Sequence, residues 1–210
     1  MVRKLMNILG IILIIAGVGI LGYYAFGKIQ VAYHQHQLRN EFQESTYEIP
    51  EEPEIPDEEP LVVVMEEWKP MRLFIPEIAL DMLVIHGEVM SEEYLDKAPV
   101  HYEMSDLPSS IDGNVAIAGH RGGRWNFFLD LDLLEEGDEL YLETGGYRFT
   151  YIVKDVFLIE PTEWWVIDST ETPSLTLTTC EPKNRIATHR LVVRAEMPEA
   201  DGVTILSRVP

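Results

Sequence analysis

Apolar and polar positions divide the chain into three parts, and the first is an uninterrupted apolar segment. Residues 5–26 contain no ionisable side chain apart from two tyrosines, and their only other polar residue is Asn7. A helix of this length, rising about 1.5 Å per residue, is about 30 Å long and can cross the hydrocarbon core of a bilayer. We therefore predict a transmembrane helix over residues 5–27.

Basic residues at one end of this segment predict its orientation. Arg3 and Lys4 precede it, and by the positive-inside rule residues 1–4 stay in the cytoplasm while the rest of the chain is exported. A cleaved signal peptide is the alternative. Its apolar region is usually about 7–15 residues long and ends at an A-x-A-like site, and no such site follows Gly22. The sequence favours an uncleaved signal anchor.

An acidic segment follows the apolar one. Between Glu41 and Glu67 there are eleven Asp or Glu residues and no Lys or Arg. Prolines recur through it, at Pro50, Pro53, Pro56 and Pro60. Charge repulsion and proline both oppose packing, so residues 28–69 are predicted to form a juxtamembrane segment and an extended acidic stalk. A calcium-binding or partner-binding tail is the alternative. The apolar residues 62–65 are candidates to pair with the following domain as an edge segment.

From residue 70 onward, short alternating segments indicate β-strands. Residues 139–143 alternate, Thr144-Gly145-Gly146 supplies a turn, and residues 147–153 are aromatic and β-branched, which predicts a hairpin. Further strands are predicted over residues 113–120, 175–180 and 190–195, and short helices over residues 91–97 and 126–134. So many short strands predict an all-β domain over residues 70–210, either a closed barrel or a sandwich.

Composition agrees with a folded domain and excludes several functions. The chain has 210 residues, of which 46% are hydrophobic, so it is not wholly disordered. Asp and Glu number 36 against 16 Lys and Arg, a formal charge of −20 without any basic cluster, which argues against nucleic-acid binding. The sequence has no Gly-rich phosphate loop, no H-E-x-x-H motif and no EF-hand spacing, so we predict neither a cofactor nor a metal.

Cys180 is the single cysteine of the chain, which excludes an internal disulfide and a multi-cysteine zinc site. On a strand it shares the more polar face with Thr176 and Thr178, next to the turn residues Glu181 and Pro182. A buried core cysteine is the plain alternative, because this small residue is often buried. Catalytic side chains, however, are often presented where a strand meets a loop. Position alone leaves both interpretations open.

A cysteine nucleophile needs a base and a donor for the developing oxyanion. Among six histidines, His120 ends a predicted strand at a strand-to-loop position. Arg190 opens the strand that returns after Cys180, so pairing of the two strands would bring it beside the cysteine. Arg185 and Arg194 are the other candidates, and any of the three arginines could instead be a solvent-facing charge.

Three pieces of the sequence together resemble the sortase family, the cysteine transpeptidases of Gram-positive cell surfaces. They are Ala118-Gly119-His120, Thr176-Leu177-Thr178-Thr179-Cys180 and Arg190-Leu191-Val192-Val193. The resemblance covers residues 70–197. The form of the cysteine motif and the short connection to Arg190 are most similar to class D and class E members.

The resemblance implies an eight-stranded sortase β-barrel with Cys180, His120 and Arg190 in one groove. It implies that Cys180 attacks the Thr carbonyl of an LPxTG-like sorting signal and forms a thioacyl enzyme. His120 then transfers protons to and from the amines, and Arg190 stabilises the oxyanion.

The resemblance also suggests substrate contacts and partners. Thr179 is expected to hydrogen-bond substrate, and Trp164 and Trp165 lie in residues 161–173, where the family places a substrate-lining loop. Barrel packing is the alternative for both tryptophans. The implied partners are proteins with LPxTG-like sorting signals and an amine acceptor, such as lipid II, a peptidoglycan cross-bridge or a pilin lysine. The implied location is the cell membrane, with a single span and an extracellular catalytic domain.

Two other functions stay open at this level. L,D-transpeptidases also combine a membrane-proximal β domain with a cysteine, but they carry Ser-His-Gly-Cys, and Thr178 occupies the place of that histidine. A membrane-anchored surface domain with a structural thiol is the non-enzyme alternative. It predicts poor labelling of Cys180 by a thiol reagent.

Overall fold

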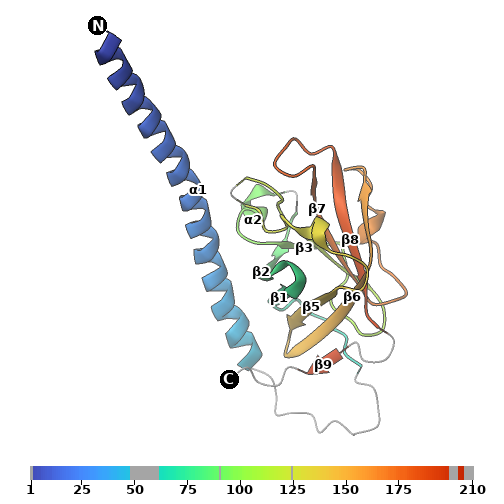
Figure 1. Ribbon diagram of the computed structural model, residues 1–210. Helices are drawn as coiled ribbons and strands as arrows, with labels where there is room; N and C mark the ends of the chain where they lie inside the picture. Colours follow the sequence, from blue (N-terminus) through green and yellow to red (C-terminus); the bar gives the residue numbers. More distant parts are fainter. Residues whose placement is uncertain (1, 48–61, 90, 124, 199–202, 206–210) are drawn as a thin grey trace.

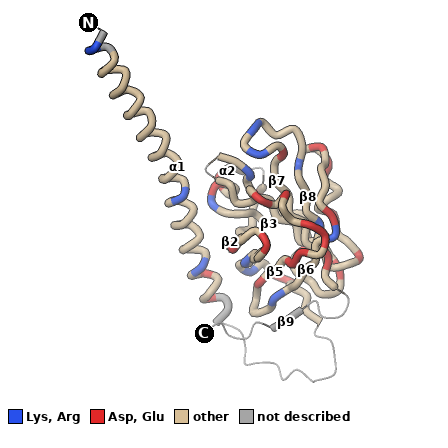
Figure 2. Tube along the Cα trace, in the orientation of Figure 1, with Lys and Arg blue, Asp and Glu red and all other residues tan. Residues whose placement is uncertain are grey.

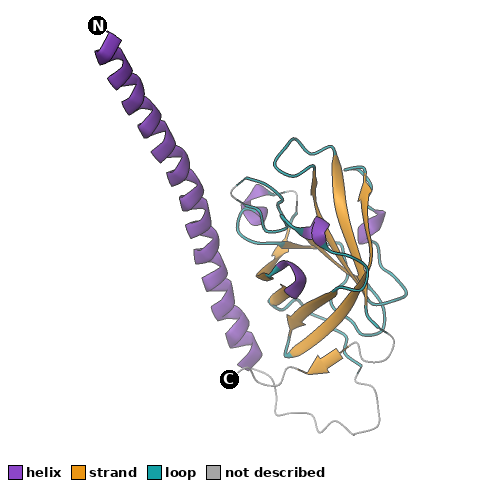
Figure 3. Cartoon of the chain, in the orientation of Figure 1, coloured by secondary structure: helices purple, strands orange, loops and turns teal. Residues whose placement is uncertain are grey.

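The computed structural model describes residues 2–47, 62–89, 91–123, 125–198 and 203–205. A long helix, α1 (Val2–Tyr47), stands beside a β domain (Figure 1). The strands are β1 (Met71–Ile75), β2 (Leu80–Gly87), β3 (Val100–Tyr102), β4 (Asn114–Ala118), β5 (Glu139–Thr144), β6 (Tyr147–Ile159), β7 (Ser174–Glu181), β8 (His189–Glu196) and β9 (Val203–Ile205). The short helical elements, α2 (Glu92–Leu95), η1 (Pro76–Ile78), η2 (Leu131–Leu133) and η3 (Trp165–Ile167), lie on the connections (Figure 3).

Eight strands close into a barrel, which confirms the predicted fold class. The order is β5-β1-β2-β3-β4-β7-β8-β6, and β6 pairs back with β5. The pairs β2–β3 and β4–β7 are parallel and the other pairs of the barrel are antiparallel. β9 adds to β6 alongside the barrel. The interior holds the apolar residues of the alternating strands, such as Leu140, Leu142, Leu175 and Leu177, all of them fully buried.

The predicted hairpin is present as β5 and β6. Gly145 and Gly146 make the turn with φ values of +55° and +86°. Two consecutive positive φ values are typical of the tight hairpin turn whose twist matches that of the strands, and glycine adopts them without steric cost. The strands predicted around Cys180 and Arg190 are β7 and β8.

The helix predicted over residues 126–134 is wrong, because only the short turn η2 forms there. The backbone of this segment is bonded to the neighbouring loop instead. Phe128 N–H donates to the carbonyl of His120 at 2.9 Å, and the carbonyl of Leu129 accepts from Arg121 Nε at 3.3 Å. Burial of Phe128 and Leu131 holds the segment on the barrel.

Helix α1 carries the predicted membrane span. The segment Met6–Glu44 contains an apolar window with a mean hydropathy of 2.3, long enough to cross a membrane, and this window is not buried. Figure 2 shows no charged residue along α1 between its N-terminal end and Lys28.

The helix does not stop at the end of the apolar segment, which corrects part of the stalk prediction. It continues to Tyr47, through residues that we expected to be juxtamembrane chain and the start of an extended stalk. The reason is local, since the first proline of the acidic segment is Pro50 and only Glu41 and Glu44 are acidic before Tyr47. The remainder of the predicted stalk, residues 48–61, lies outside the described residues.

The packed part of the β domain begins before residue 70. Val63 is 6% exposed, its N–H donates to Ser110 Oγ at 2.9 Å, and its carbonyl accepts from Ser110 N–H at 2.8 Å. Val64 forms an antiparallel bridge with Ser109. The predicted edge pairing of residues 62–65 is therefore confirmed, and the domain starts near Val63. We call residues 62–68 the strap.

Candidate active site

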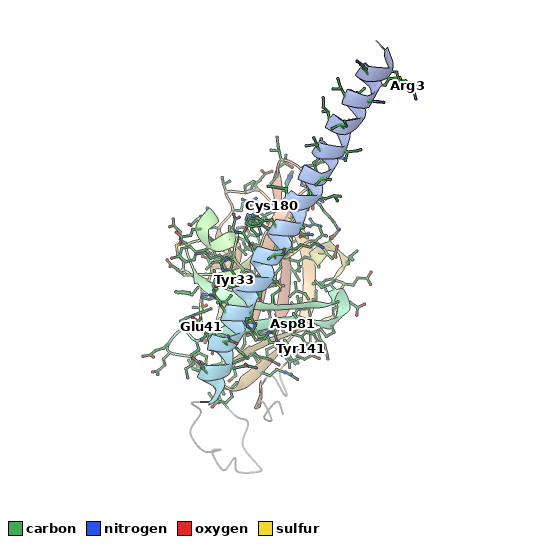
Figure 4. All side chains as sticks on the ribbon, turned by 90° about the vertical axis from the view of Figure 1, so that its left-hand side faces the viewer. Arg3, Tyr33, Glu41, Asp81, Tyr141 and Cys180 are labelled. Atoms are coloured by element: carbon green, nitrogen blue, oxygen red, sulfur yellow. The ribbon has the colours of Figure 1, made fainter. Side chains whose placement is uncertain are left out.

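Three neighbouring strands bring the predicted catalytic residues to one end of the barrel. In the parallel pair β4–β7, Ala118 lies opposite Thr178, and Gly119 N–H donates to the carbonyl of Thr178 at 3.1 Å. His120 therefore leaves β4 beside the end of β7. Figure 4 shows Cys180 at the end of the barrel that lies toward the N-terminal half of α1.

Cys180 and Arg190 face each other across β7 and β8. They are register partners, and Arg190 Nη1 lies 3.2 Å from Cys180 Sγ. Cys180 is partly exposed, which does not agree with the alternative of a fully buried core cysteine. A guanidinium stays protonated at any physiological pH, so it presents fixed donors both to the sulfur and to an oxygen bound next to it.

His120 has a carboxylate partner that sequence reasoning missed. Its Nε2 lies 3.2 Å from Asp96 Oδ1, and Asp96 follows the short helix α2. Because a carboxylate oxygen only accepts, Nε2 carries the hydrogen, which leaves Nδ1 as the nitrogen free to accept a proton. Nothing in the local sequence distinguishes Asp96 from the other acidic residues.

Thr179 fastens β7 to the segment that carries His120. It is buried, and its hydroxyl donates to the carbonyl of Gly119 at 2.6 Å. The hydroxyl that we predicted to bind substrate is thus engaged within the protein. Thr179 contributes to the site by fixing the distance between the ends of β4 and β7.

The two predicted tryptophans have different surroundings. Trp164 packs edge to face against Tyr102, with ring centroids 6.4 Å apart, and its side chain is 44% exposed. Trp165 stacks on Phe157 of β6 instead, at 5.9 Å. The structure therefore brings Trp164, but not Trp165, to the aromatic residues beside the candidate site.

Tyr102 is a further residue that sequence reasoning missed. Its hydroxyl lies 2.7 Å from Thr178 Oγ1, on the same face of β7 as Cys180. Burial raises the pKa of Tyr102, while the positive charge of Arg190 opposes that rise. The phenol is thus neutral, close to Arg190, and part of the wall of the site.

A buried arginine lies directly behind the catalytic strand ends. The Arg121 side chain is 1% exposed and pairs with Glu181, and with Asp132 at 2.8 Å. Its Nη1 also approaches the carbonyl of Cys180 at 3.5 Å. Arg121 follows His120 and Glu181 follows Cys180, so this ion pair ties the two candidate catalytic residues together through their neighbours.

Asp132, one of the partners of Arg121, also pairs with a lysine. Lys183 Nζ lies 2.8 Å from Asp132 Oδ1, and together the two cations lower the pKa of Asp132. Among the described residues, no three His, Cys, Asp or Glu side chains are grouped so that they could hold a metal ion.

The β domain of the chain matches a known protein family. A family model described as the sortase domain matches residues 73–198, which include Cys180, His120 and Arg190. The chain belongs to the sortase family. Sortases are cysteine transpeptidases, and the resemblance inferred from the three sequence motifs is confirmed.

Individual sortases are similar to this chain over its β domain. Sortase SrtE1 of Streptomyces coelicolor is 28% identical over 141 residues, 60% of this chain and 40% of that protein. Sortase A of Bacillus anthracis is 27% identical over 110 residues, 52% of this chain and 50% of that protein. The chain thus spans half or less of the length of these two relatives. A mutant of sortase E from Streptomyces avermitilis superposes with a TM-score of 0.55 at 29% identity, covering 64% of this chain and 89% of that chain.

Proposed function

We propose that this sortase is a membrane-anchored enzyme that cleaves an LPxTG-like sorting signal and joins its Thr carboxyl to an amine. The observation that supports this most is the 3.2 Å approach of Arg190 Nη1 to Cys180 Sγ at a strand end next to His120. A nucleophile, a fixed cation and a proton carrier are the parts that acyl transfer requires.

The first half-reaction forms a thioester. The thiolate of Cys180 attacks the carbonyl carbon of the Thr residue, and the charge on the oxygen is stabilised by the guanidinium of Arg190. The Thr–Gly C–N bond breaks as His120 gives a proton to the departing amine. The products are a thioacyl enzyme, which carries the part of the substrate that ends at Thr, and a released carboxyl-terminal fragment that begins at Gly with a free amine.

The second half-reaction reverses these roles. His120 takes a proton from the incoming amine, whose nitrogen attacks the thioester carbonyl. The C–S bond breaks, the new amide forms, and Cys180 leaves as the thiolate. The side chain of Asp96, 3.2 Å from Nε2, keeps His120 oriented through both steps.

Water must be kept from the thioester if transfer to an amine is to prevail over hydrolysis. Trp164 and Tyr102 supply an aromatic wall beside the strand that carries Cys180, and we propose that Trp164 contacts the bound signal. Trp165 stacks on Phe157, so we assign the contact with the signal to Trp164.

The donor and acceptor are proposed from the family chemistry and the anchor. We infer that α1 crosses the membrane with residues 1–4 in the cytoplasm, because Arg3 and Lys4 flank the apolar segment. The donor substrates are then exported proteins with LPxTG-like signals. The acceptor is an extracellular amine, such as lipid II, a peptidoglycan cross-bridge or a pilin lysine.

A ligation assay tests this function. The full-length protein in detergent is mixed with an LPxTG-type peptide library and an amine nucleophile, and the products are followed by mass spectrometry. We expect a ligated product that disappears in Cys180→Ala. Cleavage with equal efficiency in the Cys180→Ala variant would contradict the proposal, as would a folded wild-type protein with a reactive thiol that yields neither cleaved nor ligated product.

A further inference from the structure

Gln35 of helix α1 makes two hydrogen bonds to the barrel. Gln35 Nε2 donates to the carbonyl of Leu83 at 3.0 Å, and the N–H of Leu83 donates to Gln35 Oε1 at 2.7 Å. β3 pairs with β2 only from Ile85 onward, so the peptide groups of Leu83 lie on an edge that no strand covers. The side-chain amide takes the place of a neighbouring strand's peptide group and satisfies both.

The contact extends along one face of the helix. Arg39 Nη2 lies 3.7 Å from Asp81 Oδ2, and the pKa of Asp81 is lowered chiefly by Arg72 and further by Arg39. The residues of α1 turned toward the barrel include Lys28, Val31, Ala32, Gln35 and Arg39. Their spacing of three, four and seven positions places them on one stripe of the helix. Together with β2 and with residues from the segment 126–130, they line a cavity of about 600 Å³.

The attached face begins where the apolar segment ends. Gln35 is nine residues after Phe26, which is about 14 Å along a helix. Because α1 is one continuous helix, the barrel is held close to the point where α1 would leave the membrane. The stalk expected from the sequence would instead have carried the domain away from it.

The barrel is also oriented so that the end with Cys180 points toward the N-terminal end of α1. In Figure 4, Cys180 lies toward the N-terminal end of α1 relative to Tyr33 and Glu41, whereas Tyr141 lies at the opposite end of the barrel, near the level of Glu41. Figure 1 shows the same arrangement, with the β7–β8 connection toward the N-terminal half of α1 and β9 at the far end.

We propose that residues 28–39 of α1 form a bracket that presents the catalytic end of the barrel to the membrane surface. This inference rests on the proposed membrane crossing of α1. The partner that such an orientation suits is a substrate still embedded in the same membrane, whose cleavage site lies within a short distance of the lipid headgroups. The bracket binds the catalytic domain through Gln35 and Arg39, which contact Leu83 and Asp81 of β2.

The single cysteine makes the orientation measurable. A thiol-reactive fluorophore is attached to Cys180 of the full-length protein in vesicles whose lipids carry a quencher on the headgroup. A second sample carries the fluorophore at the opposite end of the barrel, as Tyr141→Cys in a Cys180→Ala background. We expect strong quenching at position 180 and weak quenching at position 141.

A matched pair of variants tests the bracket itself. Gln35→Glu removes the N–H donor and sets a carboxylate against the Leu83 carbonyl, whereas Gln37→Glu makes the same change on an exposed position whose amide bonds to Tyr33 within α1. One hydrogen bond of this kind is a factor of about five in an equilibrium. Gln35→Glu should therefore lose most of the difference in quenching between the two ends, and Gln37→Glu should retain it.

The outcomes separate the bracket from the anchor. Wild-type protein that fails to float with the vesicles overturns the membrane crossing, and the orientation with it. Protein that floats but is quenched equally at both ends overturns the orientation alone. Equal effects of Gln35→Glu and Gln37→Glu would overturn the role of Gln35, provided that both variants retain the thermal unfolding transition of the barrel.

Discussion

The surroundings of the Cys180 sulfur come from strand pairing rather than from its neighbours in the sequence. The β7–β8 register sets Arg190 opposite Cys180, and the β4–β7 register sets the His120 segment beside it. None of these residues identifies a catalytic site when taken alone. They form a candidate site because the ends of three strands meet and bring them together.

The distance from Arg190 to Cys180 Sγ leads to the first prediction. Arg190→Lys should lower kcat/KM for an LPxTG-type peptide by about 10²-fold, because a lysine cannot reproduce two fixed donors next to the reacting carbonyl. Steady-state kinetics of peptide cleavage measures this. Arg185→Lys, in the exposed connection between the same two strands, is the control and should behave as wild type. A matching loss in both variants would deny Arg190 a special role.

Arg121 leads to the second prediction. Arg121→Ala should lower the free energy of unfolding by about 2–3 kcal/mol, because it removes the charge-assisted hydrogen bonds that a buried guanidinium makes to two partly exposed carboxylates, and it should lower kcat because both strand ends lose a shared anchor. Lys183→Ala removes a cation from the same Asp132 at a half-exposed position and should cost about 1 kcal/mol or less. Denaturant unfolding compares the two variants. Similar losses would show that Arg121 is an ordinary surface charge.

At the residue scale, the sequence motifs identified Cys180, His120 and Arg190, which the structure brings to one end of the barrel. Asp96 and Tyr102 could not be found in this way, because their roles depend on which loop or strand lies across from them. The position of Thr179 next to Cys180 is visible in the sequence and suggests that its hydroxyl binds substrate, whereas its partner in the fold, the Gly119 carbonyl, is not visible there.

Among the elements, the strap is the part whose importance the sequence understated. Acidic and proline residues on its N-terminal side favoured an extended chain, yet its own apolar residues pack on the barrel. Trp68 stacks on His86, with ring centroids 4.9 Å apart, and lies at a tilt against His101, at 5.3 Å. The alternation of apolar and polar residues predicted the strands well, but it carries no information on which strands pair. In residues 126–134 the backbone makes hydrogen bonds to the neighbouring loop instead of helical ones.

Two adjacent valines of the strap supply the third prediction. Val63 is 6% exposed and Val64 is 52% exposed. Val63→Ser should therefore lower the free energy of unfolding by about 2 kcal/mol, the value of burying such a side chain, while Val64→Ser should change it by about 0.5 kcal/mol or less. Thermal unfolding of the full-length protein measures both. If Val63→Ser unfolds at the temperature of Val64→Ser, the strap is not part of the packed domain.

The histidine pair between β2 and β3 leads to the fourth prediction. His86 Nδ1 and His101 Nδ1 are 3.0 Å apart, and burial lowers the pKa of His101 from 6.5 to about 4. Between these two pH values the unfolded chain binds a proton that the folded protein does not. Stability should therefore fall as the pH falls from 6.5 to about 4, by up to about 3 kcal/mol, and level off below that interval.

Unfolding measured across this pH range, with two variants, checks the origin of the slope. His101→Gln should flatten it, because glutamine does not titrate. His189→Gln, whose side chain is half-exposed, should retain the wild-type slope. A slope that is unchanged in His101→Gln would place the titrating group elsewhere.

On the scale of the whole molecule, helix α1 and the barrel are joined by the contact of Gln35 with β2, which sets the direction in which the candidate catalytic end points. The sequence predicted each part from its own pattern, namely an apolar helix, an all-β domain and a cysteine motif. It could not predict how the parts lie together, because Gln35 and the exposed edge of β2 are ordinary positions until the fold places them side by side.

The proposed function requires that a sorting signal acylates Cys180, and the mass of the intact protein reveals this intermediate. Full-length protein is mixed with an LPxTG-type peptide, quenched in acid at short times and weighed. We expect a mass increase equal to the peptide fragment that ends at Thr, located on Cys180, absent in Cys180→Ala and released by an added amine. A folded protein whose thiol reacts with a labelling reagent but never carries the fragment, or carries it on another residue, would rule out the proposed mechanism.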